Sequence, residues 1–554
     1  MPFRELREGL ANSYPLGTSE RFKLLDAYER VLNGTIYDHL QYPYSNETDG
    51  GTYIPMMQRR PAVIYALPSI VVGQCAALMF GDEQSPTIRC WSQEGDNPFE
   101  AVEKAIETIV DRCDLEACML EAVETGAPGS VAIICRSVGD ERELYWEVQA
   151  GKFCRPVYDS ANPLRLIGLV QIYPTKAKDL FEAGYTRDEI VDPGQKPEDI
   201  RPEADYWVRI EFDRLWERRF IPMSASRYQQ IGTHDAHGRL VQWVPDEKRS
   251  VSHEFGVVPV VYIRQFTSKG IDGICLFGKI VDICYEIDYQ LSQRGRGLRY
   301  SADPLLAISR GELASQNITG PIGEDALRDS SGKVAKTAAN ILDLEAGAKA
   351  EVLEITGQGL QEMGEHIKQL REYALEVLGG MKSSSEHEKG VQSGKALDKL
   401  WEVLRLLVKR LRIPYGNRGL LPLVRLIMAG IARGAIVVPD VNPSDVDPKA
   451  PMRLIWPQMS VPQGAELLAE AEALVYLGGG TTREGYRVLD DDTVTRLAAN
   501  RLGLTDPNAV VKAREAADAE DEKAAAEALE QQQQHAITLA AAKPKPAPPQ
   551  RGNG

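Results

Sequence analysis

Cysteine is sparse in this chain of 554 residues and is not arranged for metal binding or cross-linking. No CxxC pair occurs among the eight cysteines, which are Cys75, Cys90, Cys113, Cys118, Cys135, Cys154, Cys275 and Cys284. A chain of this length with 43% hydrophobic residues can build about two to four structural modules without covalent staples. We therefore expect reduced thiols in a cytosolic product.

Positive charge is also in short supply. The 64 Lys and Arg residues are outnumbered by 80 Asp and Glu residues, which gives a formal net charge of −16. A surface that grips duplex DNA through its phosphates would be basic, so the acidic balance argues against such a surface. The balance is compatible with a wall past which DNA must slide.

A secretory signal is not evident, because residues 1–17 contain no apolar h-region. One run imitates a membrane span: residues 61–80 carry no charge and follow two arginines. Pro68 and Gly73 interrupt this run, and a helix buried in a large assembly gives the same pattern. We favour the buried helix, and a membrane-associated scaffold is kept as an alternative.

Catalytic motifs are missing as well, since the chain has neither GxSxG nor HExxH. Residues 273–279 nearly match a P-loop, but Ile280 replaces the hydroxyl residue that would hold Mg²⁺. His234 and His237 have HxxH spacing, which differs from the i, i+4 spacing of a zinc helix and fits a turn between strands. We expect no enzyme, no catalytic residue, no cofactor and no metal site; a P-loop-like ATPase is the weaker alternative.

The hydrophobic patterning predicts an α+β chain that is predominantly helical. Helical spacing occurs at residues 24–32 and 99–122. Polar loops are expected at 41–53 and 192–205. Segments rich in β-forming residues and separated by turn signals lie at 131–138, 144–149, 166–173, 206–212, 214–221 and 257–266.

Residues 277–434 are the most organised part of the sequence. A helix is followed by a strand-like stretch from Pro304, a second helix from Leu360, a polar loop and a longer third helix. The first helix has apolar residues on one face and acidic residues near its start. Near its end lie Arg294, Arg296 and Arg299, which complement the helix macrodipole and need no ligand to explain them.

The third helix has a leucine seam with steps of three and four residues: Leu397, Leu400, Leu404, Leu407 and Leu411. Two heptads are too few for an autonomous coiled coil, so we expect the seam to pack against neighbouring subunits or the protein's own core. The proline and glycines of residues 414–419 should break or kink the helix, and a second apolar helix should follow.

The C-terminal part becomes steadily more polar. Residues 452–489 predict a strand, a proline turn and two helices, the second capped by Thr481 or Thr482. Residues 509–534 are rich in Ala, Glu and Gln and should form a polar helix. The last 21 residues, 534–554, cannot bury enough surface to fold and should be disordered.

The order of these segments resembles that of tailed-bacteriophage portal proteins over roughly residues 20–505. Residues 59–83 look like the early portal helix, and 278–308 look like a stem helix that runs into the first clip strand. Residues 353–379 look like the returning stem helix, 381–411 like the tunnel loop and tunnel helix, and 453–489 like the passage from wing to crown. The likeness rests on this order and not on one invariant signature.

The resemblance implies a portal fold around an axial channel, with boundaries that we assign along the chain. These are a wing of mixed α/β structure (1–276), a first stem helix (277–300), a clip (301–350), a second stem helix (351–380), a tunnel loop (381–394), a tunnel helix with its continuation (395–434), a return to the wing (435–460), a crown (461–533) and a tail (534–554).

The resemblance also implies a function. A portal subunit is not an enzyme; about twelve copies form a homo-oligomeric ring, a dodecamer, at the vertex between capsid and tail of the virion. The ring assembles in the host cytoplasm with the major capsid or scaffolding protein and docks the packaging terminase. It passes double-stranded DNA without reading its sequence and later binds head–tail connector or adaptor proteins, with no membrane involved.

The implied DNA-channel residues form the polar loop Lys382, Ser383, Ser384, Ser385, Glu386, His387, Glu388 and Lys389. The loop has no large apolar group, and its lysines and serines would contact phosphates only, which carry no sequence information. An acidic wall elsewhere would repel phosphates and let DNA slide. A solvated connector is the alternative interpretation of this loop.

Overall fold

The computed structural model describes residues 3–81, 84–90, 99–163, 165–234, 240–266, 270–302, 305–309, 349–353, 357–379 and 404–457, together with Lys523. It mixes helices with sheets, as an α+β chain should. The chain divides into two compact units, Met1–Gly81 with Cys90–Arg453, and Asp82–Arg89 with Leu454–Gly554. Strands β5 (Thr87–Cys90) and β17 (Met452–Ile455) pair in a small two-stranded sheet. The elements described below belong to the first unit.

The N-terminal part contains helices α1 (Phe3–Gly9) and α2 (Glu20–Leu32). Ser19 caps α2, since its side chain accepts a hydrogen bond from the Phe22 N–H, and the helix therefore starts before the predicted residue 24. The predicted polar loop 41–53 contains three strands of two residues each: β1 (Tyr42–Pro43), β2 (Thr48–Asp49) and β3 (Thr52–Tyr53). Strand β1 pairs in parallel with β4 (Arg59–Arg60), which follows the loop.

Two helices replace the single helix that the spacing predicts over residues 99–122. They are α4 (Glu100–Arg112) and α5 (Leu115–Gly126). Asp114 between them has φ +48°, a left-handed conformation that ends the first helix and redirects the chain. Residues 61–80 are not one helix either: α3 spans Leu67–Phe80, and its Val71, Cys75 and Met79 are buried.

The two main sheets are antiparallel. The three-stranded sheet has the order β14-β6-β7, with β6 (Ser130–Val138) between β14 (Val260–Arg264) and β7 (Glu143–Ala150). Helix α5 packs against this sheet. The β6 residues Val131, Ala132, Ile133 and Ile134 are fully buried, so this strand runs through the core.

The second sheet has the order β13-β11-β10-β9-β8, and β12 (Met223–Ser224) also pairs with β10. Its centre contains the predicted strands β9 (Leu166–Lys176), β10 (Asp205–Phe212) and β11 (Trp216–Phe220), whereas its edges are β8 (Cys154–Tyr158) and β13 (Pro245–Ser252). Short helices α6 (Ala177–Glu182), α7 (Arg187–Ile190) and α8 (Ala225–Tyr228) border it. A buried cluster that includes Leu169, Ile210 and Phe212 forms its core.

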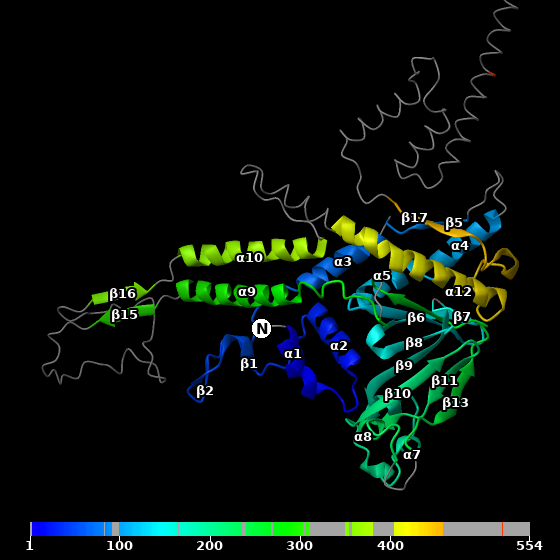
Figure 1. The fold of residues 1–554 in the computed structure, drawn as a ribbon, viewed down its shortest axis with the longest axis horizontal. Helices are drawn as coiled ribbons and strands as arrows, with labels where there is room; N and C mark the ends of the chain where they lie inside the picture. Colours follow the sequence, from blue (N-terminus) through cyan, green and yellow to red (C-terminus); the bar gives the residue numbers. More distant parts are fainter. Residues whose placement is uncertain are drawn as a thin grey trace, which may run out of the picture. The chain divides into compact units, whose positions relative to one another are not determined.

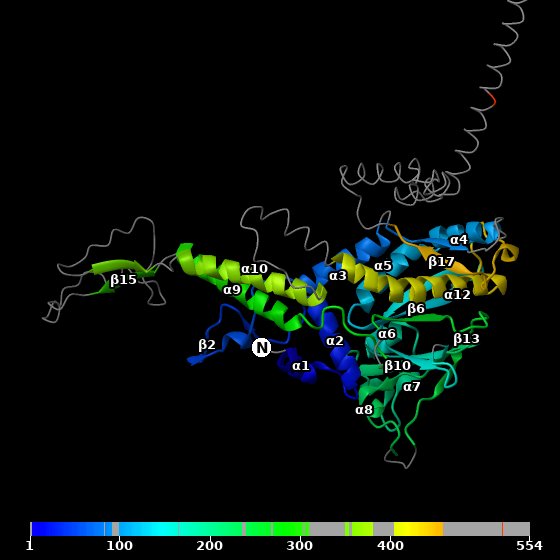
Figure 2. The ribbon, with the colours of Figure 1, turned by 45° about the horizontal axis from the view of Figure 1, so that its top comes forward.

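A helical arm follows β14. Helix α9 (Val281–Ala302) leads to strand β15 (Leu305–Ser309), which pairs antiparallel with β16 (Lys349–Leu353), and helix α10 (Gly357–Gly379) returns beside α9. Figures 1 and 2 show the two helices side by side with the β-hairpin at their far end. The helix–β–helix order predicted for residues 277–380 is therefore present.

A long helix crosses the predicted break at residues 414–419. Residues 404–412 are helical, a π-helix spans Ile413–Leu420, and α12 continues as Leu421–Ala432. Pro414 has no N–H and its ring would clash with the preceding α-helical turn. Residues 413–420 instead adopt the wider i→i+5 ladder, at whose end the Leu421 N–H donates to the Gly416 carbonyl. The predicted break is therefore absent, although the regular α-helical ladder does stop at Arg412, where the proline and glycines begin.

Candidate functional site

The arm is held together by one face of α10 that contacts α9. Its buried residues are apolar or small: Leu360, Gly364, Ile367, Ala374 and Leu378. Arg294 of α9 lies against the glycine, since a Cβ at Gly364 would come 3.1 Å from the guanidinium carbon. A side chain at residue 364 would therefore require the Arg294 guanidinium to shift.

A buried carboxylate anchors α9 to the N-terminal part of the chain. The Asp288 carboxylate accepts a hydrogen bond of 2.7 Å from the Tyr65 N–H and one of 2.9 Å from the Tyr37 hydroxyl. Asp288 is only 5% exposed. Burial raises its pKa to about 6, although both hydrogen bonds act to lower the pKa. This carboxylate therefore titrates close to neutral pH.

Ser292, one turn further along α9, continues the anchor. Its hydroxyl accepts the backbone N–H groups of Ala62 (3.0 Å) and Val63 (3.1 Å). On the same stretch of helix, the Tyr289 hydroxyl donates to the Arg59 carbonyl at 3.0 Å. The segment 59–65 has little regular structure, so its backbone N–H and C=O groups need hydrogen-bond partners from elsewhere. The contacts with α9 supply those partners. The segment 59–65 is thus fixed to α9.

The three arginines predicted near the end of α9 have different surroundings. Arg294 packs on Gly364, Arg296 pairs with Glu47, and Arg299 is exposed. The structure does not bring them into one cluster. This agrees with the interpretation that they complement the helix dipole and neighbouring groups without a ligand.

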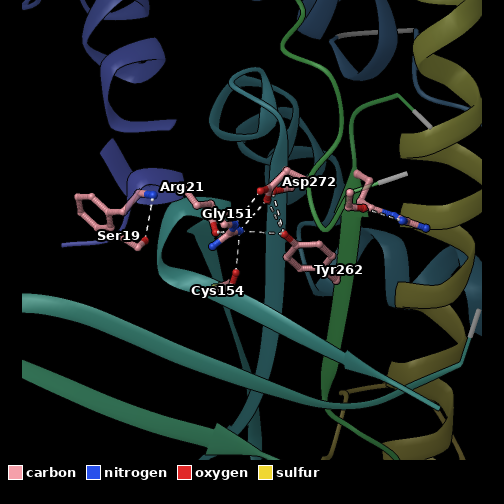
Figure 3. A network of polar contacts seen from close by, with 10 residues as sticks. Ser19, Arg21, Gly151, Cys154, Tyr262 and Asp272 are labelled. Carbon is pink, nitrogen blue, oxygen red and sulfur yellow. Dashed lines mark hydrogen bonds and ion pairs between the residues drawn. The ribbon is translucent and has the colours of Figure 1, made fainter. Parts of the chain in front are cut away.

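The loop that leads into α9 is tied to three other elements by a polar network (Figure 3). Arg21 of α2 makes a bidentate ion pair with Asp272, with both N···O distances 2.6 Å, and donates to the carbonyls of Gly151 and Cys154. Asp272 also accepts hydrogen bonds from the hydroxyls of Ser130 (2.6 Å) and Tyr262 (3.1 Å). The fork geometry of the guanidinium makes this a directional clamp at the root of the arm.

The same loop contains the P-loop-like residues 273–279, and its backbone is already engaged. The Gly273 N–H donates to the Gly129 carbonyl at 3.1 Å, and the Leu276 N–H donates to the Ala127 carbonyl at 2.9 Å. A Cβ at Gly273 would lie 2.5 Å from the Gly129 oxygen, so the glycine permits close backbone packing. Phosphate binding would need these N–H groups to point outward. The glycine break before a buried helix is the better account of this segment.

The other candidate chemistry is not assembled in the described residues. His234 forms an isolated β-bridge with Leu240, and His237 lies outside the described residues. Within the described ranges, no three His, Cys, Asp or Glu residues group in a way that could hold a metal ion. All eight cysteines are free thiols in the structure. Of the helices that the structure describes, none combines the length and apolar character that a membrane crossing requires.

The leucine seam is buried where it is described. Leu404, Leu407 and Leu411 are at most 2% exposed, which confirms the predicted apolar face. Leu397 and Leu400 lie outside the described residues, as do the tunnel-loop residues 382–389, the predicted crown apart from Lys523, and the tail. The burial of the seam arises within one copy of the chain, where the helix packs against its own body.

Comparison with known proteins finds no family model that matches the chain. It likewise finds no curated protein that matches. The geometry of the arm and of the long helix must therefore carry the functional argument.

Sequence reasoning missed the Asp288 anchor and the Arg21–Asp272 clamp. Asp288 is one of the acidic residues that the sequence places near the start of the first helix, where a carboxylate is ordinarily solvated. One signal was available: Asp288 lies between Ile287 and Tyr289, which are both buried. An acid flanked by apolar residues on both sides is a candidate for burial. The clamp joins residues 251 positions apart and leaves no local signal.

Proposed function

We propose that this protein is the subunit of a portal ring, the channel through which a tailed bacteriophage packages and ejects its double-stranded DNA. The observation that carries the proposal is the arm, in which α9 runs out to the β15–β16 hairpin and α10 returns beside it. A long helix follows in the sequence and packs into the body. This is the order of stem, clip, stem and tunnel helix in portal subunits.

In this proposal the arm is the stem and its hairpin is part of the clip. The clip would dock the terminase during packaging and connector proteins afterwards. The loop from Lys382 to Lys389 would face the channel, and about twelve copies would surround the DNA. No catalytic group is required, because the motor and the connectors are separate proteins.

Two observations favour the portal proposal over its alternatives. The P-loop-like segment 273–279 uses its N–H groups within the fold, which weakens the ATPase alternative. The charge-free run 61–80 is split, and part of it is hydrogen-bonded to α9 through Ala62 and Val63, which weakens the membrane-anchored scaffold.

The mass of the purified particle tests the proposal. A ring of about twelve subunits of 61.3 kDa each would be seen by light scattering and would show a central hole in negative-stain images. A protein that stays monomeric at high concentration, with DNA or partner proteins present, would refute the ring. Detergent-dependent solubility would favour the scaffold, and nucleotide turnover would favour the ATPase.

A further inference from the structure

The segment of residues 404–433, which is helical to Ala432 and ends with the C-cap Arg433, is basic in a chain that is otherwise acidic. It contains Arg405, Lys409, Arg410, Arg412, Arg418, Arg425 and Arg433 and no Asp or Glu, while the whole chain has a net charge of −16. A solvated helix face normally mixes both signs at i, i+4 spacing. A segment of thirty residues with seven cations and no acid departs from that pattern.

The cations lie on the solvent side of this helix. Its exposed positions are mostly basic, and the basic ones are Arg405, Lys409, Arg410, Arg418, Arg425 and Arg433. The other exposed side chains are Ile413, Asn417 and Ala432. We call the six exposed cations the basic face. The opposite side, which includes the leucine seam, is buried in the body.

The π-helix contributes to the alignment of this face. Twenty residues of straight α-helix would leave Arg425 about 200° around the axis from Arg405, which is nearly the opposite side. The i→i+5 turns of Ile413–Leu420 advance less per residue than α-helical turns and reduce this rotation. Arg405 and Arg425 are consequently both exposed while the seam and α12 stay buried.

Three cations of the basic face have no partner of opposite charge among the residues that the structure describes. Arg405, Lys409 and Arg425 form no ion pair with any residue in the described ranges. Arg410 stacks on the Phe266 ring at 4.6 Å, which positions the guanidinium without removing its charge. Asp440 pairs with Arg112 and Glu254 pairs with Arg142, which are cations outside this face.

We infer that the basic face binds the phosphate backbone of duplex DNA; this rests on the proposed function for the identity of the polyanion. Between Arg405 and Arg425 the face extends about 30 Å, the length of about nine base pairs. Five of its six cations are arginines, whose planar fork fits phosphate oxygens. Such contacts carry no sequence information, as a channel requires. The overall negative charge would still limit how tightly the DNA is held.

The test compares two triple variants of the full chain in their binding to a short mixed-sequence duplex. One is Arg405→Gln with Lys409→Gln and Arg425→Gln. The control is Arg155→Gln with Lys196→Gln and Arg201→Gln, which removes three exposed cations from other elements. Anisotropy is measured over a range of salt concentrations, and light scattering checks the rings in each sample.

If all three side chains contact phosphates, the salt slope should fall by about 0.9 for each lost contact, and affinity at 0.15 M salt should fall about 100-fold. The control should bind like the native chain.

Equal binding by the two triple variants, or no binding by the native chain, would overturn the inference. Rings that fail only in the basic-face variant would also overturn it, because a neighbouring copy would then occupy the face. If the protein forms no rings but its DNA binding still depends on the basic face, the inference is upheld and the portal proposal fails.

Discussion

The stability of the anchor that joins α9 to residues 59–65 should depend on pH, and Asp288→Asn should remove this dependence. In the folded protein the pKa of Asp288 is about 6, against 3.8 for the free side chain. The difference is about two units, so the ionised carboxylate destabilises the folded anchor by about 3 kcal/mol above pH 6. The folded state binds this proton more tightly than the unfolded state. Stability of the anchor therefore increases as the pH falls from about 6 to about 4.

The backbone N–H of Tyr65, which donates to Asp288, gives a local measurement. Its hydrogen-exchange protection, corrected for the intrinsic effect of pH, should increase about tenfold between pH 8 and pH 5 in the native chain. In Asp288→Asn this amide should show no such increase, because the neutral amide does not titrate. Other acidic groups are the same in both proteins, so the difference isolates Asp288.

Tyr37→Phe is the matched control. The Tyr37 hydroxyl donates to Asp288 at 2.9 Å and acts to lower its pKa. Without that hydroxyl, the pKa of Asp288 should rise further, and the pH dependence should persist with its midpoint moved upward. If Asp288→Asn keeps the native pH profile at Tyr65, the reasoning is refuted, since another group would then control the anchor.

Three further predictions concern packing and the channel. Leu404→Asp places a charge at a side chain that is 1% exposed, so it should cost several kcal/mol and yield aggregated protein; normal soluble rings would show that this face is not buried. Gly126→Ala should lower the free energy of unfolding by about 1–3 kcal/mol, because the new Cβ would come 2.3 Å from the Tyr415 hydroxyl oxygen. Denaturant unfolding of the double variant with Tyr415→Phe should show that part of this loss is recovered. Exchanging Lys382 and Lys389 for Glu should leave rings intact but change the amount of DNA packaged or retained; unchanged packaging in a particle assay would remove the loop from the mechanism.

The predictions from sequence succeeded where local patterning decides the structure. The six predicted β-segments are strands in the structure, and β8 and β13, which are among the strands that were missed, are the two edges of the larger sheet. Edge strands carry proline and charge, and β13 reads PDEKRSVS, so they lack the apolar alternation that marks central strands. The helices of the arm were predicted within a few residues because each has one continuous apolar face.

The remaining errors have tertiary causes. The break expected at Pro414 is absent because a π-helix spans it, and Tyr415 at that place is fully buried with its hydroxyl donating to Gln265 at 2.6 Å. The acidic composition argued against any surface that grips DNA, yet a mean charge says nothing of where the cations gather. The relevant signal was the run of 37 residues without an acid, 403–439, which is visible in the sequence.

The contacts along α9 have a mechanical consequence for the arm. The clamp at Asp272 holds its root, and the contacts of Asp288 and Ser292 tie the middle of α9 to residues 37–65. Helix α9 has 22 residues and is about 33 Å long. If the contacts at its middle broke, a rotation of about 10° at its root would move the far end by about 6 Å. A load applied to the hairpin would pull directly on the Tyr37–Asp288 and Tyr65–Asp288 hydrogen bonds, so the N-terminal segment would sense force at the tip.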